Sequence, residues 1–229
     1  MKKTVAIILI QIVYAGICVA QQDTNKTRKP FRQDQWLIDF YHDNWLNKSD
    51  SIKTKWKSHG ISVSAMYDHP VKNTNFNFAA GIGFASHNVR NDGQIARQGD
   101  TISLVIPIGD SFQYKRNKLS TNYIDVPVEV RFRTKPGKKG YSIKFSLGAR
   151  AGYLVNVHTA TIISGKYFNK DKYKDYKIPD IARYRYGVHF RAGYGKAAVF
   201  GFYSLSTLFA KNKGPDIIPF SAGISVMPF

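Results

Sequence analysis

From Trp36 to the end of the chain, hydrophobic and polar residues alternate with a period of two almost everywhere. In the clearest stretch, residues 119–134, one face carries isoleucine, valine and phenylalanine, whereas the other carries Asp125, Pro127, Glu129 and two arginines. This alternation is typical of β-strands whose two faces meet different surroundings, and helical periodicity is nearly absent. The pattern therefore predicts an all-β chain.

Eight segments carry the alternation. They are residues 36–43, 58–69, 75–87, 119–134, 141–158, 181–194, 197–208 and 220–229. The connections after the second, fourth and sixth segments are short, whereas those after the first, third, fifth and seventh span 44–57, 88–118, 159–180 and 210–219. Outer-membrane barrels alternate short periplasmic turns with long extracellular loops in this way. We therefore expect an eight-stranded antiparallel up-and-down transmembrane β-barrel with both termini in the periplasm.

A soluble sandwich or barrel would also alternate, with its apolar face as the core. The second face here is rich in glycine, alanine and serine and carries scattered charges, which suits the narrow lumen of an eight-stranded barrel. We therefore favour the membrane interpretation and expect a lumen charge network in which arginines and a lysine pair with acids that include Asp68. Its expected members are Asp125, Glu129, Arg131, Lys144, Arg150, Arg183, Arg185, His189 and Arg191. Pro127 is expected to mark a bulge, because a closed barrel has no free edge for it.

The first twenty residues are typical of a signal peptide. Lys2 and Lys3 precede a mostly apolar run, and Cys18 and Ala20 place small residues at the −3 and −1 positions of a cleavage site. An uncleaved anchor is the alternative, but the run is shorter than the roughly 20 residues that a spanning helix needs. We expect a signal peptide at 1–20, a flexible periplasmic tail at 21–35 and the barrel at 36–229. Cleavage would remove the only cysteine.

The chain is strongly basic, with 34 Lys+Arg against 15 Asp+Glu and a net charge of +19. Such a balance indicates an anionic partner, either nucleic acid or anionic lipid. Export makes nucleic acid an unsuitable partner, so the expected partners are outer-membrane lipid and the phosphates of lipopolysaccharide. A charged barrel interior would account for part of the excess.

Catalytic motifs are missing from the sequence. There is no G-x-S-x-G, no H-E-x-x-H and no P-loop, and no two of the six histidines are spaced as a metal pair with a further ligand. His189 is conceivable as the base of a lipid-A-modifying hydrolase, but nothing in the sequence assembles a triad around it. We expect no catalytic residue, no cofactor and no metal, and a structural role for His189.

Two long connections carry unusual residues. Residues 166–177 interleave aromatic residues with lysines, and residues 102–108 are apolar enough to form a strand extension, a lid or a docking segment for another protein. A solvated loop is the alternative for the first of them. The candidate contacts with lipopolysaccharide or a partner are Lys166, Tyr167, Lys170, Lys172, Tyr173 and Lys174.

The run from Leu119 to Glu129, LSTNYIDVPVE, resembles a motif of PorT-like outer-membrane barrels of Bacteroidetes, in which Tyr-apolar-acidic-apolar-Pro opens a central strand. Residues 203–209, Gly214-Pro215 and the final strand to Phe229 resemble the last hairpin of that group. The resemblance implies an outer-membrane barrel of about eight strands. It also implies an accessory or structural role in a complex with other outer-membrane proteins, such as the type IX secretion machinery with which PorT is associated. A lipid-A-modifying enzyme and a small passive pore are the alternatives.

Overall fold

The computed structural model describes residues 36–98, 102–108, 114–137, 141–165, 168–176, 178 and 180–227. The predicted signal peptide and tail, residues 1–35, lie outside these residues. Eleven strands are formed in the described part: β1 (Trp36–Leu46), β2 (His59–Pro70), β3 (Phe76–Arg90), β4 (Gly93–Gln98), β5 (Ile102–Pro107), β6 (Tyr114–Arg133), β7 (Ile143–Gly165), β8 (Phe168–Asp175), β9 (Tyr184–Tyr194), β10 (Ala197–Ser204) and β11 (Ile218–Val226). Within the same residues, no helix is long and apolar enough to cross a membrane.

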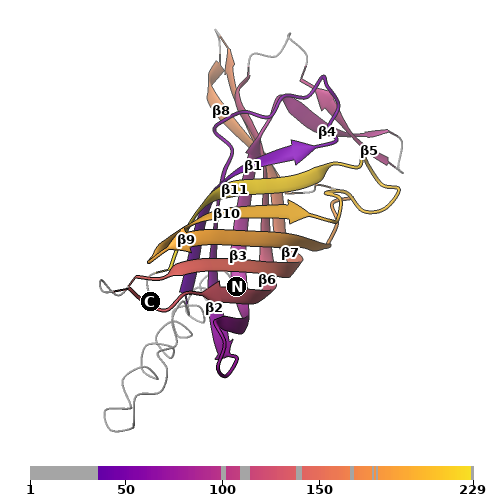
Figure 1. The fold of residues 1–229 in the computed structure, drawn as a ribbon. Coiled ribbons are helices and arrows are strands. Elements are labelled where there is room, and N and C mark those ends of the chain that lie inside the picture. Colours follow the sequence, from indigo (N-terminus) through magenta and orange to yellow (C-terminus); the bar gives the residue numbers. More distant parts are fainter. Residues whose placement is uncertain are drawn as a thin grey trace, which may run out of the picture. The chain divides into compact units, whose positions relative to one another are not determined.

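Eight of the strands form a closed barrel (Figure 1). The order around the barrel is β6-β3-β2-β1-β11-β10-β9-β7, and the pairing of β7 with β6 completes the ring. Every pair is antiparallel, and the first strand pairs with the last, from Ile38–Val226 to Leu46–Ile218. These are the eight strands that the alternation predicts, so the all-β barrel fold is confirmed.

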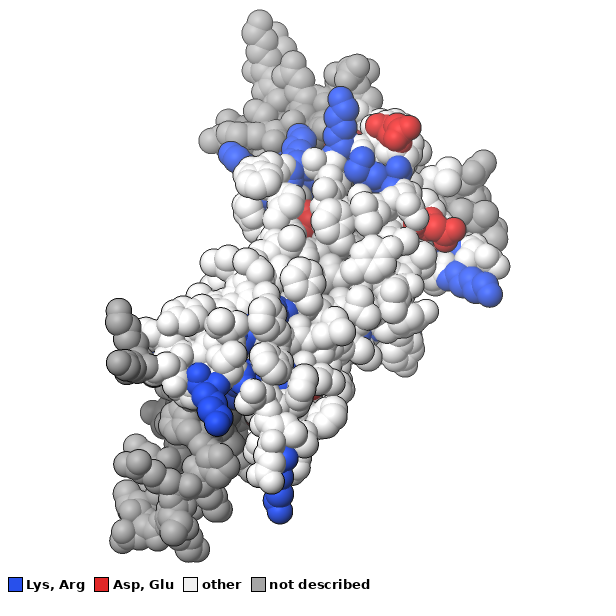
Figure 2. Space-filling view, viewed as in Figure 1, with Lys and Arg blue, Asp and Glu red and all other residues white. Residues whose placement is uncertain are grey.

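The apolar residues of the barrel strands point outward. On β9, Tyr186, Val188 and Phe190 are exposed, whereas Arg185, Gly187 and His189 between them are buried in the lumen. On the face seen in the space-filling view, charged side chains gather toward the two ends, and few are exposed between them (Figure 2). A water-soluble barrel has the opposite arrangement, so this surface is suited to lipid.

Pairs of tyrosines mark the height of the apolar band. Tyr141 packs against Tyr194 at the end with the short turns, and Tyr153 packs against Tyr184 ten residues further along β9. Ten residues extend roughly 34 Å along a strand, which a tilt of about 40° reduces to about 26 Å along the barrel axis. This matches the roughly 25 Å band, flanked by aromatic girdles, of outer-membrane barrels.

The opposite end of the barrel carries the long connections and a second set of strands. The insert at 88–118 extends β3 and β6 and forms the β4–β5 hairpin, so the apolar segment 102–107 is a strand of its own. β8 continues the sheet beyond β7, pairing from Thr159–Asp175 to Gly165–Phe168. We call β4, β5, β8 and the connections 47–58 and 205–217 the long-loop platform.

Pro127 does not mark a bulge. β3 and β6 pair up to Ala80–Val128 and resume at Gly83–Asp125 in the same register, so no residue is inserted. On the other side, Pro127 pairs with Arg150 in an unbroken ladder with β7. Because proline has no N–H to donate, the β3 ladder is interrupted there without a shift. The register shift near this part of β6 lies at Asn122/Tyr123, where Val155 is the extra residue on β7.

Candidate functional site

The lumen is filled by apolar and charged side chains. An apolar cluster lies at the short-turn end, consisting of Leu37, Met66, Ala79, Ala198 and Met227. A larger apolar core lies at the long-loop end, consisting of Trp45, Val89, Leu119, Ile181, Leu208, Phe209 and Ile217. Charged residues and three aromatic rings, Tyr41, Phe200 and Phe202, occupy the space between them. Near the short-turn end, apolar and charged residues lie side by side, since Leu37, Ala198 and Met227 line the same small cavity as Glu129, Arg131 and Arg191.

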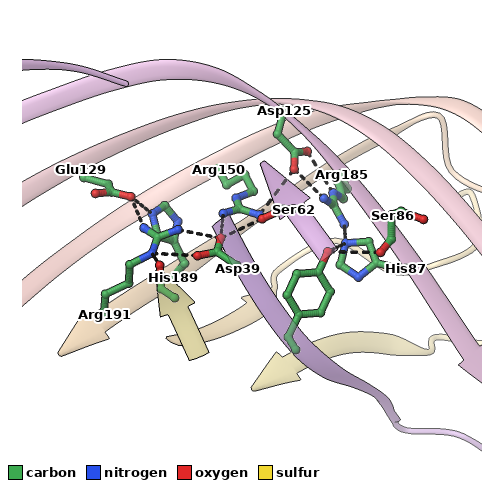
Figure 3. A network of polar contacts seen from close by, with 12 residues as sticks. Asp39, Ser62, Ser86, His87, Asp125, Glu129, Arg150, Arg185, His189 and Arg191 are labelled. Atoms are coloured by element: carbon green, nitrogen blue, oxygen red, sulfur yellow. Dashed lines mark hydrogen bonds and ion pairs between the residues drawn. The ribbon is translucent and has the colours of Figure 1, made fainter. Parts of the chain in front are cut away.

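Arg191 on β9 is the centre of the first group of charges (Figure 3). Its Nη2 and Nε donate to the two carboxylate oxygens of Asp39 on β1 at 2.9 and 3.2 Å, and its Nη1 donates to Glu129 on β6. The same oxygen of Glu129 contacts His189 Nε2 at 2.9 Å. A bidentate guanidinium–carboxylate pair of this kind is directional and strong. It joins strands that lie on different sides of the barrel.

Arg150 and Arg185 connect this group to a second one. Arg150 lies 3.5 Å from both Asp39 and Asp125, and Arg185 makes a bidentate contact with Asp125 at 2.7 and 3.3 Å. Arg185 Nη1 also donates to His87 Nε2 at 2.6 Å. That contact requires an acceptor at Nε2, so the proton of His87 is on Nδ1 and points to Asp43, 2.8 Å away. The network thus runs continuously from Glu129 to Asp43.

A third group lies toward the short-turn end. Arg131 Nε donates to Glu129 at 2.8 Å, and Arg133 pairs with Asp68 on β2 at 2.8 Å. Arg131 also approaches Asp68, at 3.9 Å. Glu129 therefore receives three cationic or imidazole partners, which is why a fully buried carboxylate can stay ionised there.

The network is electrically neutral. Five arginines (131, 133, 150, 185 and 191) face five carboxylates (Asp39, Asp43, Asp68, Asp125 and Glu129). These ten residues therefore contribute no net charge, whereas Lys144, which lines the same cavity as Glu129 and Arg131, adds one positive charge to the lumen. The +19 of the whole chain resides in residues outside these ten.

Small residues on β7 make room for the network. A Cβ on Gly152 would lie 2.2 Å from Asp125 Oδ1, and a Cβ on Gly148 would lie 2.3 Å from the Val128 carbonyl oxygen and 2.8 Å from a ring carbon of His189. Such distances are too short for any side chain. The glycines on the lumen face are thus required by the arginine and histidine side chains that cross in front of them.

The structure brings most of the predicted network together. Arg183 is the exception, because β9 begins at Tyr184 and the Arg183 side chain is exposed beyond the end of the lumen. Lys144 is half-buried and lines a small cavity with Glu129 and Arg131. Sequence reasoning missed Asp39, Asp43 and His87, which the alternation of β1 and β3 places on the lumen face opposite Ile38, Phe40 and Phe84.

Of the six candidate contacts on the 159–180 connection, four lie within the described residues. Lys166 and Tyr167 lie outside the described residues. The backbone of Lys170 and Lys172 belongs to β8, and the side chains of Tyr173 and Lys174 on the same strand are exposed.

The lumen offers little for catalysis. Ser221 Oγ donates to Asp43 at 2.7 Å rather than to His87, whose two nitrogens are taken by Asp43 and Arg185, so the three residues do not form a nucleophile–base pair. The cavity beside His87 and Arg185 has a volume of about 30 Å³, room for only one or two water molecules. Among the described residues no cluster of His, Cys, Asp and Glu could hold a metal ion.

Comparison with known proteins agrees with this architecture. The family model described as "Outer membrane protein beta-barrel domain" matches residues 33–209, from just before β1 into the connection after β10. A search of curated proteins finds no match. The chain belongs to the outer-membrane protein β-barrel domain family and is an outer-membrane barrel of eight strands.

Proposed function

We propose that the protein is a non-enzymatic accessory or structural subunit of an outer-membrane protein complex, which it contacts through the long-loop platform. The observation that carries this proposal is the contrast between the two ends of the barrel. The lumen is packed and its charge network is neutral, whereas the long-loop end builds extra strands on a core of its own. The PorT-like motif favours secretion or assembly machinery, with type IX secretion as the first pathway to test.

The closed lumen argues against the two alternatives. A passive pore needs a continuous water path, and here ion-paired side chains fill the lumen together with an apolar core at the long-loop end and a smaller apolar cluster toward the other end. A lipid-A-modifying enzyme needs a nucleophile and a base that the lipid can reach. Ser221, Asp43 and His87 are buried in the lumen, and the serine hydroxyl donates to the aspartate rather than to the histidine. Eight-stranded barrels are normally filled by side chains in this manner.

Tertiary hydrogen bonds and apolar contacts fix the conformation of the long-loop platform. Ser103 on β5 donates through its backbone N–H to the Lys213 carbonyl at 2.9 Å and through its hydroxyl to Asp180 at 2.8 Å. Ile181 pairs with Phe209 in an isolated bridge inside the apolar core. Long connections fixed in this way suit a surface that a partner recognises, since less ordering entropy is lost on binding.

The platform also exposes apolar and aromatic side chains that a partner would cover. Ile106 on β5 and Tyr173 and Tyr176 on and beside β8 are all exposed. Tyrosine is enriched in protein interfaces because its ring is large and has a polar end. We further propose that this end faces outward and that both termini are periplasmic, as the short turns at the other end favour.

Affinity purification from native membranes tests the proposal. The tagged full-length protein is expected to bring the same outer-membrane partner from independent preparations. A variant with Ile106→Ser, Tyr173→Ser and Tyr176→Ser should lose it, whereas Lys72→Ser with Lys135→Ser in two short turns should keep it. A barrel that always purifies alone, or a partner lost only from the short-turn variant, would contradict the proposal. Lipid A from a deletion strain should have an unchanged mass spectrum, because we assign no enzymatic role.

A further inference from the structure

A groove of about 530 Å³ lies outside the lumen at the long-loop end. Lys55, Trp56 and Lys57 form one wall, and Arg90 on β3 and Arg116 and Asn117 on β6 form the other. None of the described residues that line it is acidic. Asp92, two residues beyond the end of β3, accepts a hydrogen bond from the Lys53 backbone N–H at 2.6 Å and does not line the groove.

The two walls are held together by backbone hydrogen bonds. The Lys55 N–H donates to the Arg90 carbonyl at 2.7 Å, and the Arg90 N–H donates to Ser58 Oγ at 2.9 Å. Thr54 and Asn91 form an isolated bridge beside them. The connection 47–58 is therefore fixed against the end of β3, and the cationic side chains are brought together by the fold rather than by chance contact of mobile loops.

Arg116, a half-buried residue of the groove, has a side-chain donor that could bind an anion. Its Nε is buried and has no hydrogen-bond partner among the described residues. Buried donors in native proteins are nearly always paired, and guanidinium groups are suited to bidentate contact with phosphate. Trp56, 80% exposed beside these cations, offers an aromatic face of the kind on which sugar rings pack.

On the outer wall of the barrel, the outward-facing positions of β3, β6 and β7 change in chemistry from one row to the next toward this groove. Phe84, Ile124 and Tyr153 form the last apolar row across β3, β6 and β7. The next rows across the same strands are Ser86, Asn122 and Asn156, then Asn88, Ser120 and His158, and then the cationic pair Arg90 and Lys118. The wall thus changes from lipid-facing to hydrogen-bonding and then to cationic.

The height of the groove indicates which anion it meets. Arg90 is six residues beyond Phe84, the last exposed apolar residue on β3, which corresponds to about 15 Å along the barrel axis for a strand tilted by about 40°. Phospholipid headgroups extend only about 5–8 Å beyond the hydrocarbon. Lipopolysaccharide carries phosphates on sugars above its acyl chains, so its charges extend into this layer.

We propose that the groove binds phosphate groups on the saccharide part of lipopolysaccharide, with Arg90 and Arg116 as the phosphate-binding residues. The inference rests on the proposed outward orientation of the long-loop end. It does not depend on membership of a complex.

Binding of fluorescent lipopolysaccharide to the purified full-length barrel in neutral detergent tests this inference. The phosphorylated lipid should bind at least about tenfold more tightly than the same lipid after dephosphorylation, and Arg90→Ala with Arg116→Ala should abolish that preference. Lys211→Ala with Lys213→Ala is the matched control, since it removes the same charge from exposed positions at the same end and should change the affinity less than about twofold. Lys57→Ala, at an exposed position of the groove, provides a second variant should the arginine pair impair assembly, and it should also weaken the preference for the phosphorylated lipid.

Equal losses in both double variants, or equal binding of the dephosphorylated lipid, would overturn the inference, because general charge attraction would then explain the binding. Labelling of Lys211→Cys in intact cells with a membrane-impermeant maleimide tests the orientation separately. Absence of labelling would place the groove in the periplasm and would also overturn the inference. Neither result would bear on whether the tagged protein brings a partner from native membranes.

Discussion

Replacing Asp39 with asparagine removes one negative charge from the centre of the lumen network and leaves the size of the side chain unchanged. Asp39 is fully buried (0% exposed) and accepts hydrogen bonds from Arg191 at 2.9 and 3.2 Å and from Ser62 Oγ at 2.8 Å. Arg150 lies 3.5 Å from the same carboxylate. The asparagine amide group would direct N–H donors at guanidinium donors, so the substitution leaves two buried cations short of a partner.

The expected loss of unfolding free energy depends on which carboxylate partners Arg191 and Arg150 keep after the substitution. Removing one partner from a buried ion pair destabilises a protein by about 3–5 kcal/mol. Arg191 keeps its contact with Glu129, and Arg150 keeps Asp125 at 3.5 Å. We therefore expect the lower end of that range, about 3 kcal/mol. Ser62→Ala removes only one neutral donor to the same carboxylate and should cost about 1 kcal/mol.

Equilibrium urea unfolding of the barrel in lipid vesicles measures these free energies, with tryptophan fluorescence and the gel-mobility shift of folded barrels as two readouts. A double-mutant cycle with Arg191→Leu should give a coupling energy above about 1.5 kcal/mol between Asp39 and Arg191. A cost for Asp39→Asn no greater than that of Ser62→Ala would refute the reasoning. It would mean that water or a rearranged side chain compensates the arginines, and hence that the lumen is not closed.

Three further substitutions test other parts of the structure. Leu147→Arg, at a lipid-facing position (67% exposed) midway between the two tyrosine pairs, should destabilise the barrel in vesicles by about 2–4 kcal/mol; a negligible effect would contradict the membrane-facing assignment. Gly148→Val should prevent assembly, measured as the folded fraction on gels, whereas Gly137→Val in a short turn should not, because its Cβ would meet only one atom, at 3.8 Å. Phe209→Ala (1% exposed) should weaken the long-loop core by about 3–5 kcal/mol and open the platform to protease, while Leu205→Ala (56% exposed) should have little effect; equal proteolysis of both would refute a packed core there.

The barrel could be predicted from sequence because the side-chain period of a strand is two and both faces here have a distinct chemistry. On β6, Val126, Val128 and Val130 alternate with Asp125 and Glu129, and the structure keeps that parity without a shift through Pro127. Strand ends were less predictable, since alternation persists for a residue or two into a connection. Arg183 has the parity of a lumen residue, but it precedes β9 and is exposed.

Partners across the lumen could not be predicted in the same way. Asp39 and Arg191 are 152 residues apart, and their meeting depends on how far each strand is staggered relative to the next around the ring. Stagger is set by the sum of eight registers, which alternation in single strands does not encode. Asp39 and Asp43 are less evident from sequence because few apolar residues, such as Ile38 and Phe40, mark the outward face of the short segment 36–43.

The neutrality of the lumen network changes what the basic composition means. A charge excess located inside a barrel would serve only to fill it, but the five arginines of the network are matched by five carboxylates. The excess therefore resides in residues outside these ten. At the long-loop end the fold concentrates part of it in one groove, beside a buried guanidinium nitrogen with no partner among the described residues. Because unpaired buried donors are costly, an anion at that position accounts for both observations together.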